Sequence, residues 1–595
     1  MSPEGEADWS FGPRIVEGGV SFRLWAPALD RVSLVITGEG PRPMRRLPDG
    51  WFVLEVPGAG AGTGYRFQLP DGLMVPDPAS RFQPEDVHGP SEVTDPAAYP
   101  WRDGDWRGRP WHEAVIYELH LGAFTPEGSF RAAITKLDHL VALGVTFIEI
   151  MPVADFPGAR NWGYDGVLPY APDASYGRPE DFKALVDAAH ARGIGVLLDV
   201  VYNHFGPDGN YLPLYAPHFF TERHQSPWGA GINVDGPESR MVREYFIQNA
   251  LYWTREFHLD GLRFDAVHAI QDDSEQHLLE EMAERLRAEA AGRPLHLILE
   301  NEANGARMLE RDAAGEPRLY TAQWNDDVHH VLHVAATGER AGYYEAYAEA
   351  PALLGRALAE GFAFQGEVMP YSGHARGEPA AHLPPLAFVA FAQNHDQIGN
   401  RALGERLASL ASPEVPRAIS CAYLLAPQVP MLFMGEELGA AEPFLFFADF
   451  EGDLADAVRQ GRRAEFARFP EFSDPEKRER IPDPVAEPTF QSCKLRWDAA
   501  DPAVLDWYRR ILATRREEIL PLLPRITRGG TARMLADGAV EVQWQAAEAR
   551  LHLQANLSAR TVSGFSDSGA RTIWQEGGRL AEGALPPWSV RWSCA

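Results

Sequence analysis

The chain has 595 residues, 45% of them hydrophobic, which is enough for a large core divided over roughly two or three domains. It carries 84 acidic and 55 basic side chains, a formal net charge of −29, and this balance argues against nucleic acid as a partner, because binding phosphates requires clustered Lys and Arg. A neutral ligand is compatible with it.

Neither a targeting segment nor a disulfide framework is expected. The first residues, MSPEGEAD, lack a basic start and an apolar stretch, and no apolar run in the sequence reaches membrane-spanning length. We therefore predict a cytoplasmic protein without a membrane anchor. The cysteines, Cys421, Cys493 and Cys594, are odd in number and widely spaced, which predicts reduced thiols.

The two ends of the chain have the pattern of β domains. Residues 1–95 alternate apolar and polar side chains in short runs separated by Gly and Pro, which predicts a small antiparallel β-sandwich. Residues 96–112, rich in Pro, Trp, Asp and Gly, are expected to form a linker. Residues 525–595 return to short alternating runs, so we predict a second β domain there.

The middle of the chain, residues 113–524, alternates apolar runs with helical periodicity, which predicts a parallel α/β fold. The apolar runs lie at 115–121, 145–151, 194–199, 261–265, 295–300, 320–325, 386–392 and 430–434. Helices are expected at 129–143, 179–191, 239–257, 274–290, 344–360 and 503–520. Eight strands with intervening helices predict a (β/α)8 TIM barrel. The Pro-, Gly- and aromatic-rich stretch 203–237 is expected to be an irregular excursion beside the barrel mouth.

Charged residues stand where several of the apolar runs end. Arg263 and Asp265 alternate on one side of the run at 261–265, and a strand sends every second side chain to the same side. Taken alone, such a pair is more often a buried ion pair than a site. Further polar residues end other runs, at 199–204, at Glu300 and at 393–396. Because the carboxyl ends of barrel strands meet in one mouth, we expect these residues to lie together.

These four stretches, in this order and spacing, resemble the conserved regions of the α-amylase superfamily (glycoside hydrolase family 13). The resemblance implies that Asp265 is the nucleophile, Glu300 the general acid/base and Asp396 the transition-state stabiliser that binds the distorted sugar. The chemistry agrees, because cleaving an acetal requires two carboxyl groups in different environments. Arg263, two residues before Asp265, would keep that carboxylate ionised by charge pairing and hydrogen bonding.

The choice of Glu300 as acid/base has a competitor, Glu302, two residues later. Glu300 directly ends the apolar run, and a Glu followed four residues later by Asn304 resembles the pattern of trehalose-releasing members of the superfamily. We therefore predict that Glu300 is the acid/base and that Glu302 is a supporting or solvated residue.

The resemblance also implies a set of substrate-binding residues. Asp199 would support Arg263, while His204 and His395 would hydrogen-bond the sugar ring. Each of these alone could be a satisfied polar group at a barrel rim. A binding role is expected for them if they lie together with the carboxylates.

Tyr164 is the predicted stacking platform for a sugar ring. It lies twelve residues before Tyr176-Gly, the interval found in amylases, and an aromatic face complements the apolar face of a sugar; the alternative is a core aromatic. His268 stands where many amylases have a lysine that binds the acceptor-side sugar, which departs from simple amylase specificity. Aromatic residues of the stretch 203–237 either line sugar subsites or pack within a folded loop: Tyr211, Phe219, Phe220 and Trp228.

Three further stretches, 120–130, 151–167 and 443–450, most resemble the maltooligosyltrehalose trehalohydrolase family. Members of that family hydrolyse, with retention, the α-1,4 bond next to the terminal trehalose of maltooligosyl trehalose, and they act after a maltooligosyltrehalose synthase. The resemblance implies the same substrate and upstream partner here, with no cofactor. No metal is predicted, although Asn203 and Asp208 offer oxygen ligands near the first region.

Two alternatives remain open at this point. A glycogen branching enzyme has the same fold and nucleophile, and its relatives share the residues at 162–164 and 434–437, so these signals do not separate the two activities. A non-catalytic carbohydrate-binding relative would keep the barrel. Such relatives commonly lose the catalytic carboxylates, whereas this chain retains all three.

Overall fold

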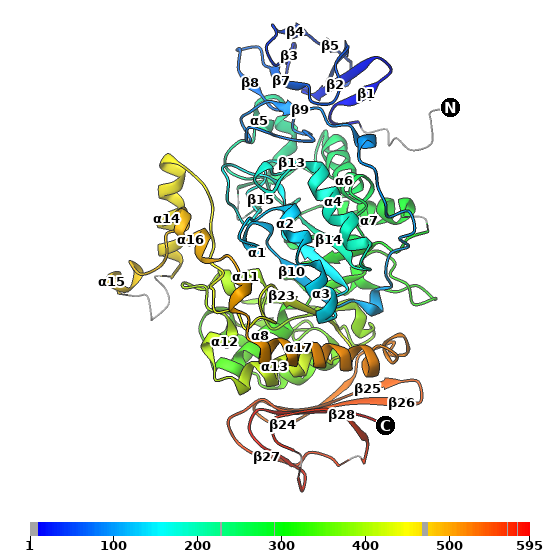
Figure 1. The fold of residues 1–595 in the computed structure, drawn as a ribbon, viewed down its shortest axis with the longest axis vertical. Coiled ribbons are helices and arrows are strands. Elements are labelled where there is room, and N and C mark those ends of the chain that lie inside the picture. The colour runs from blue at the N-terminus through cyan, green and yellow to red at the C-terminus, as the bar shows by residue number, and fades with distance from the viewer. Residues whose placement is uncertain (1–9, 227–228, 291, 467–473, 568, 580) are drawn as a thin grey trace.

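Eight parallel strands form a closed barrel at the centre of the structure, a computed structural model that describes residues 10–226, 229–290, 292–466, 474–567, 569–579 and 581–595 (Figure 1). The strands follow one another around the barrel in chain order: β10 (Ile116–Leu119), β11 (Phe147–Ile150), β14 (Gly195–Val200), β17 (Gly261–Phe264), β18 (His296–Leu299), β19 (Ala322–Trp324), β22 (Phe388–Ala390) and β23 (Val429–Phe433). Each lies on one of the eight apolar runs, so the predicted TIM barrel is confirmed.

Two layers of side chains with opposite character fill the barrel interior. Four fully buried apolar side chains belong to one interior cluster: Ile116, Phe147, Leu197 and Ile298. Because every second side chain of a strand shares a face, the residues two positions further along also point inward. These are all acidic: Glu118, Glu149, Asp199 and Glu300. The apolar layer is called the lower layer below, and the acidic layer is called the upper layer.

Helices connect the barrel strands and cover their outer face (Figure 1). The longer ones are α3 (Leu137–Leu143), α4 (Pro179–His190), α6 (Ser239–Glu256), α7 (Leu278–Glu289), α8 (Asp326–Thr337), α10 (Ala352–Glu360), α13 (Glu414–Leu424) and α17 (Pro502–Thr514). Their starts have recognisable causes. Pro179 occupies the first position of α4, where no N–H is needed, and the Asp501 carboxylate accepts from two backbone N–H groups of α17.

Several helices differ from the sequence prediction. The expected helix at 129–143 is divided into α2 (Phe130–Ile134) and α3, and that at 344–360 is divided into α9 (Glu345–Ala348) and α10. Pro351 lies between the latter two, where its ring and missing N–H interrupt a helix. The last helix ends at Thr514 and continues as one π turn. Helices α8 and α13 are not among those predicted.

Antiparallel sheets lie at the two ends of the molecule (Figure 1). At the N-terminal end, one sheet contains β1 (Arg14–Val16), β2 (Gly19–Trp25), β6 (Trp51–Pro57) and β5 (Arg45–Arg46), and a second contains β4 (Arg42–Pro43), β3 (Ser33–Ile36), β7 (Gly64–Gln68), β8 (Met74–Val75) and β9 (Ser91–Glu92). At the C-terminal end, a sheet contains β24 (Thr531–Ala536), β25 (Ala539–Ala546), β26 (Ala549–Asn556), β30 (Ser589–Cys594) and β28 (Arg571–Glu576). The exact domain boundaries stay a prediction.

The segment 203–237 is more ordered than its composition suggests. It contains α5 (Leu212–Tyr215) and an antiparallel hairpin of β15 (Phe220–Ser226) and β16 (Gly229–Ile232). A second hairpin, β12 (Ala154–Asp155) with β13 (Leu168–Pro172), follows β11. The chain between its two strands carries the stretch Asn161 to Asp165, which reaches the barrel mouth.

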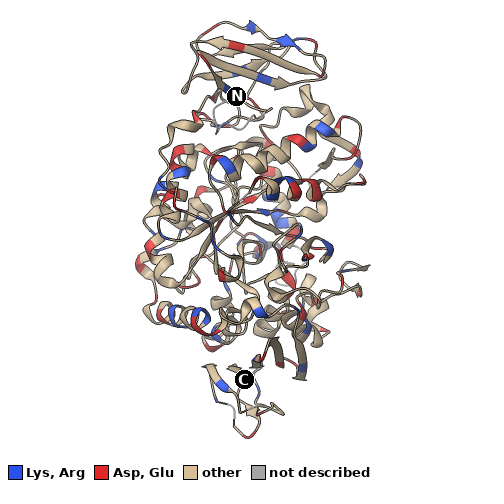
Figure 2. Cartoon of the chain, turned by 90° about the vertical axis from the view of Figure 1, so that its right-hand side faces the viewer, with Lys and Arg blue, Asp and Glu red and all other residues tan. Residues whose placement is uncertain are grey.

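Positions of acidic and basic residues are interspersed along the barrel helices (Figure 2). None of the helices in the described residues is both long and apolar enough to span a lipid bilayer. All three cysteines are free thiols. To one side of the barrel, α14 (Gly452–Phe466) and α15 (Pro475–Arg478) extend outward (Figure 1).

Candidate active site

One arginine, Arg263 on β17, lies at the centre of the candidate site. Its side chain is fully buried, and its guanidinium packs against the ring of Trp324, 4.0 Å from the ring centre. Nη1 donates to Asp199 at 2.6 Å and to Asp265 at 2.9 Å, and Nη2 lies 3.2 Å from Glu300. A single guanidinium therefore bridges carboxylates from the ends of three neighbouring strands.

Asp265 directly follows β17 and is held from two sides. Arg263 contacts its Oδ1, and the amide of Asn203 donates to its Oδ2 at 2.9 Å and to its carbonyl oxygen at 3.0 Å. The next residue, Ala266, has a φ of 40°, in the left-handed region that few non-glycine residues adopt. This turn ends the strand, and two donors orient the Asp265 carboxylate.

Glu300 lies in a different environment. Its Oε2 accepts from the backbone N–H of Ala266 at 2.6 Å and faces Arg263. Burial raises the pKa of the Glu300 carboxyl well above its usual range, although the charge of Arg263 opposes the shift. A carboxyl with a raised pKa can hold a proton and donate it to a leaving oxygen.

Glu302, the competing glutamate, lies outside this group. Its side chain is 66% exposed, and one carboxylate oxygen lies 3.7 Å from Nε2 of His268. The backbone N–H of Glu302 donates to Nδ1 of the same imidazole at 3.3 Å. Burial lowers the pKa of His268, although the charge of Glu302 opposes that shift. His268 and Glu302 thus form a pair at the rim.

A second group surrounds His395, the first residue of the short helix α11 (His395–Gly399). The ring of Tyr164 stacks on the imidazole with ring centres 5.2 Å apart, and its hydroxyl lies 2.9 Å from Nε2. Asp396 approaches the same Nε2 at 3.5 Å, and its other oxygen accepts from Asn400 at 3.1 Å. The Asp396 side chain is 40% exposed, so its carboxylate is open to a ligand.

Tyr164 joins the two groups. Its hydroxyl donates to Oδ2 of Asp199 at 2.6 Å, the same oxygen that Arg263 contacts. Burial raises the pKa of Asp199 to about 7, with the Arg263 charge acting in the opposite direction. Tyr164 therefore takes part in the hydrogen-bond network of the site in addition to presenting an aromatic ring.

His204 lies behind Tyr164. Its Nε2 donates to the backbone carbonyl of Tyr164 at 2.9 Å, and its Nδ1 contacts the side-chain oxygen of Asn203. Burial lowers the pKa of His204, although the charge of Asp265 opposes the shift. These contacts position Tyr164 and Asn203, and a direct bond from His204 to a sugar stays a prediction.

Two residues at the site are not among those predicted for it. Asn203, expected only as a possible metal ligand, orients Asp265. Glu118 on β10 contacts the imidazole of His395. The sequence contains a signal for Glu118, because an acidic residue inside an apolar run, two positions after Ile116, must point into the barrel.

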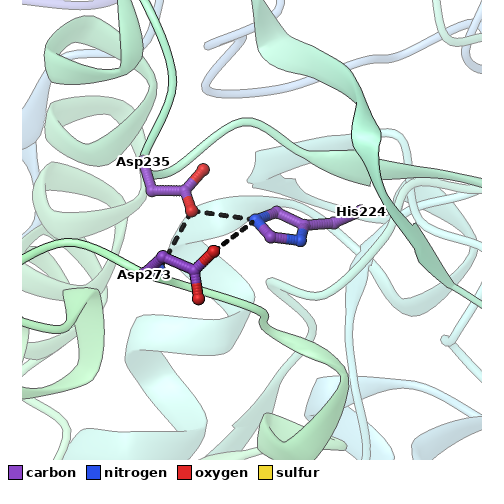
Figure 3. A group of neighbouring side chains, drawn as sticks. All are labelled: His224, Asp235 and Asp273. Atoms are coloured by element: carbon purple, nitrogen blue, oxygen red, sulfur yellow. Dashed lines mark hydrogen bonds and ion pairs between the residues drawn. The ribbon is translucent and has the colours of Figure 1, made fainter.

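One group among the described residues brings His and Asp atoms close enough to hold a metal ion: His224, Asp235 and Asp273 (Figure 3). Nε2 of His224 lies 2.8 Å from Asp235 and 4.0 Å from Asp273. The guanidinium of Arg223 lies 3.3 Å from Asp235 and 2.7 Å from Asp273. In Figure 3 the second oxygen of Asp235 points away from the other two side chains. Arg223 thus supplies the cation of this group.

The stretch 203–237 makes structural contacts. Asp208 and Tyr211 both contact His88, at 3.4 and 2.7 Å, which ties the segment to the N-terminal part of the chain. Phe219 is buried in the core. Packing, the alternative to a sugar subsite, therefore accounts for Phe219. Trp228 lies outside the described residues.

The fold and the residues at the barrel mouth define the class of the protein. A closed parallel barrel, with carboxyl groups in contrasting environments at the C-terminal ends of its strands, is the arrangement of a carboxylate-dependent glycoside hydrolase.

The family model "Alpha amylase, catalytic domain" matches residues 90–214. Two proteins named malto-oligosyltrehalose trehalohydrolase are similar to this chain: that of Deinococcus radiodurans is 44% identical over 84% of this chain and 81% of its own, and that of Saccharolobus solfataricus is 41% identical over 85% and 87%. The chain belongs to the malto-oligosyltrehalose trehalohydrolase family.

One solved structure is similar over nearly the whole chain. It is a crystal structure whose title names a putative α-amylase from Salmonella typhimurium. The two sequences are 48% identical and the TM-score is 0.94. The match covers 98% of this chain and 99% of the other. A model described as a domain of unknown function (DUF3459) matches residues 527–592, which contain the C-terminal sheet. The similarity therefore extends from the barrel into both flanking regions.

Proposed function

We propose that the protein hydrolyses the α-1,4-glucosidic bond next to the terminal trehalose of maltooligosyl trehalose, releasing trehalose and a maltooligosaccharide with retention at the cleaved centre. The trehalose preference is supported by the names of the two relatives, each more than 40% identical over most of the chain. The observation that carries the chemistry is the bridge formed by Arg263, which contacts Asp265 and Glu300 with different nitrogens.

In the first proposed step, a carboxylate oxygen of Asp265 attacks the anomeric carbon as the bond to the trehalose oxygen breaks. Glu300 transfers its proton to that oxygen, so trehalose leaves as a neutral molecule and a glucosyl ester remains on Asp265. The raised pKa of Glu300 favours this role, since the group holds its proton before the step. Arg263 and Asn203 hold Asp265 in place for the attack.

In the second proposed step, water attacks the same anomeric carbon and Glu300, now ionised, accepts a proton from it. The ester bond to Asp265 breaks and the maltooligosaccharide is released, which restores both carboxyl groups. Two inversions at one carbon give net retention. Asp396 would bind hydroxyl groups of the distorted sugar, because a charged acceptor makes strong, directional hydrogen bonds.

The remaining site residues are proposed to bind the substrate. Tyr164 and His395 would contact the sugar on the side away from the cleaved bond, whereas His268, at the rim beyond Asp265, would contact the trehalose side. The substrate is proposed to come from a maltooligosyltrehalose synthase, and we propose that both act in the cytoplasm. Fractionating cells and probing for the protein would test the location.

Product chromatography tests the proposed activity. The pure protein is incubated in parallel with maltooligosyl trehalose and with amylose. Rapid release of trehalose from the first, with little change in the second, is the expected result. New α-1,6 branch points in amylose without trehalose release would instead identify a branching transferase. No turnover of either substrate would contradict both activities and favour a non-catalytic binding protein.

A further inference from the structure

Two glutamates of the upper layer, Glu118 on β10 and Glu149 on β11, are direct neighbours with contrasting partners. They are paired in register across the two parallel strands, and each residue is 1% exposed. They share residue type, layer and burial. Any difference between them must therefore come from what surrounds each carboxyl group.

Glu118 accepts two hydrogen bonds from His395. The backbone N–H of His395 donates to Oε2 at 3.2 Å, and Nδ1 of the imidazole contacts Oε1. On the opposite side of the ring, Nε2 lies 2.9 Å from the hydroxyl oxygen of Tyr164. Because that hydroxyl donates its own proton to Asp199, its oxygen accepts from His395. Both ring nitrogens thus face acceptors, which is the environment of an imidazolium.

Glu149 has no such partner. Neither of its carboxyl oxygens has a hydrogen-bond partner within the described residues. An ionised carboxylate buried without a partner is very unfavourable, so such a group keeps its proton. Burial, reinforced by the charge of Glu118, raises the pKa of Glu149 well above its usual range. One negative charge on the pair, located on Glu118, satisfies both environments.

We propose that Glu118 is a positioning residue, whose carboxylate holds His395 as an oriented imidazolium facing Tyr164 and Asp396, while Glu149 is a neutral carboxylic acid that does not act on the site. The inference rests on the proposed function, since it assigns the role of His395 in binding the sugar next to Asp265. Glu118 acts through His395 and touches no substrate.

The charge of His395 depends on titratable and charged groups from its own helix, α11, and from the strands and loops packed against it. Burial alone lowers the pKa of this imidazole, but the carboxylates of Asp396 and Glu118 outweigh burial and raise it to about 9. The titratable and charged groups that act on it are Asp396, Glu118, Tyr164, Arg263, Glu149 and His120. Of these, Asp396 and Glu118 are the ones that stabilise the cation most.

The first test measures His395 directly by NMR, with 13Cε1-labelled histidine and the His395→Asn variant to assign its signal. We expect the wild-type signal to titrate near pH 9, well above the value of about 6.5 for a free imidazole. Glu118→Gln should lower that midpoint by about one pH unit or more, because the isosteric amide removes the charge. Glu149→Gln, the matched control, should leave it unchanged.

Each other outcome overturns the inference. A wild-type midpoint at or below that of a free imidazole would do so without any variant, which covers the case that Glu118→Gln does not fold. An unchanged midpoint in Glu118→Gln, or an equal shift in Glu149→Gln, would do so as well. The titration needs no substrate, so a wild-type protein that releases no trehalose would contradict the proposed function alone.

The second test is kinetic and separates positioning from a purely structural role. At pH 8, Glu118→Gln should lower kcat/KM about 10-fold or more, the loss typical of a hydrogen bond to a charged group. Glu149→Gln should stay within about 2-fold. Adding Glu118→Gln to His395→Asn should cost little beyond His395→Asn alone, because the two residues act as one unit. Fully additive losses would show that Glu118 does not act through His395.

Discussion

The upper and lower layers of the barrel come from the same strands, two residues apart, yet they differ in the polarity and charge of their side chains. In the lower layer, Phe147 and Ile298 are fully buried among other apolar side chains. In the upper layer, Glu149 and Glu300 occupy the next inward positions and carry perturbed pKa values. Burial stabilises the fold in the first case. In the second, burial disfavours ionisation, which prepares Glu300 as a proton donor and keeps the partnerless Glu149 neutral.

The chemistry lies at one end of the barrel because the charged side chains of the interior are gathered there. Arg263 compensates the charges that the upper layer and the adjacent Asp265 bring into the interior. Without this guanidinium, several buried carboxylates would face one another unpaired, which is very unfavourable. The lower layer needs no such compensation. The barrel thus combines an apolar part that maintains the fold with a charged part that the fold must hold in place.

The largest effect is expected from Asp265→Asn. The amide keeps the size of the side chain, its oxygen can still accept from Arg263, and Asn203 can still donate to the backbone carbonyl of residue 265. The amide is a very poor nucleophile, so kcat should fall by at least about 10⁴-fold. Initial-rate kinetics on maltooligosyl trehalose measure this, and thermal unfolding serves as the control for an intact fold. Residual hydrolysis within 100-fold of wild type would contradict the nucleophile assignment.

A smaller but more diagnostic loss is expected from Glu300→Gln, about 10²- to 10⁴-fold, with Glu302→Gln as the matched control within a few-fold. Because Glu300 has a raised pKa and must be protonated for the first step, wild-type activity should fall as pH rises through that pKa. With an α-maltosyl fluoride, whose leaving group needs no proton, Glu300→Gln should recover the rate of the first step, measured as a burst of fluoride release, whereas the second step stays slow because it still needs the base. A larger loss in Glu302→Gln would exchange the two roles.

Much of this arrangement can be predicted from the sequence because it depends on local patterns. Continuous apolar runs mark the barrel strands, since strands buried on both faces leave no room for alternation. Arg263 and Asp265 are recognisable because they share one side of a strand, and Glu300 because it ends one.

Other features depend on contacts that no local pattern contains. Glu118 and His395 are 277 positions apart, so their pairing becomes visible only when the barrel closes. Asn203 orients Asp265 across 62 positions for the same reason. The hairpin of β15 and β16 is missed because its many Gly and polar residues have low strand propensity, and tertiary packing outweighs that preference.

A smaller effect on activity than that of either carboxylate variant, and the clearest separation of the two layers, is expected from Phe147→Ala. Removing a fully buried ring leaves a cavity in the lower layer and should cost about 3–5 kcal/mol of the free energy of unfolding. The upper layer and its ion pairs keep their partners, so kcat/KM should stay within about 10-fold where the protein is folded.

Urea denaturation, monitored by tryptophan fluorescence, measures the stability of the Phe147→Ala protein. Val141→Ala on the outer surface, where Val141 is 44% exposed, is the control and should change stability by no more than about 0.5 kcal/mol. A Phe147→Ala protein of normal stability but without activity would show that the lower layer positions the carboxylates directly and that the two layers are one functional unit.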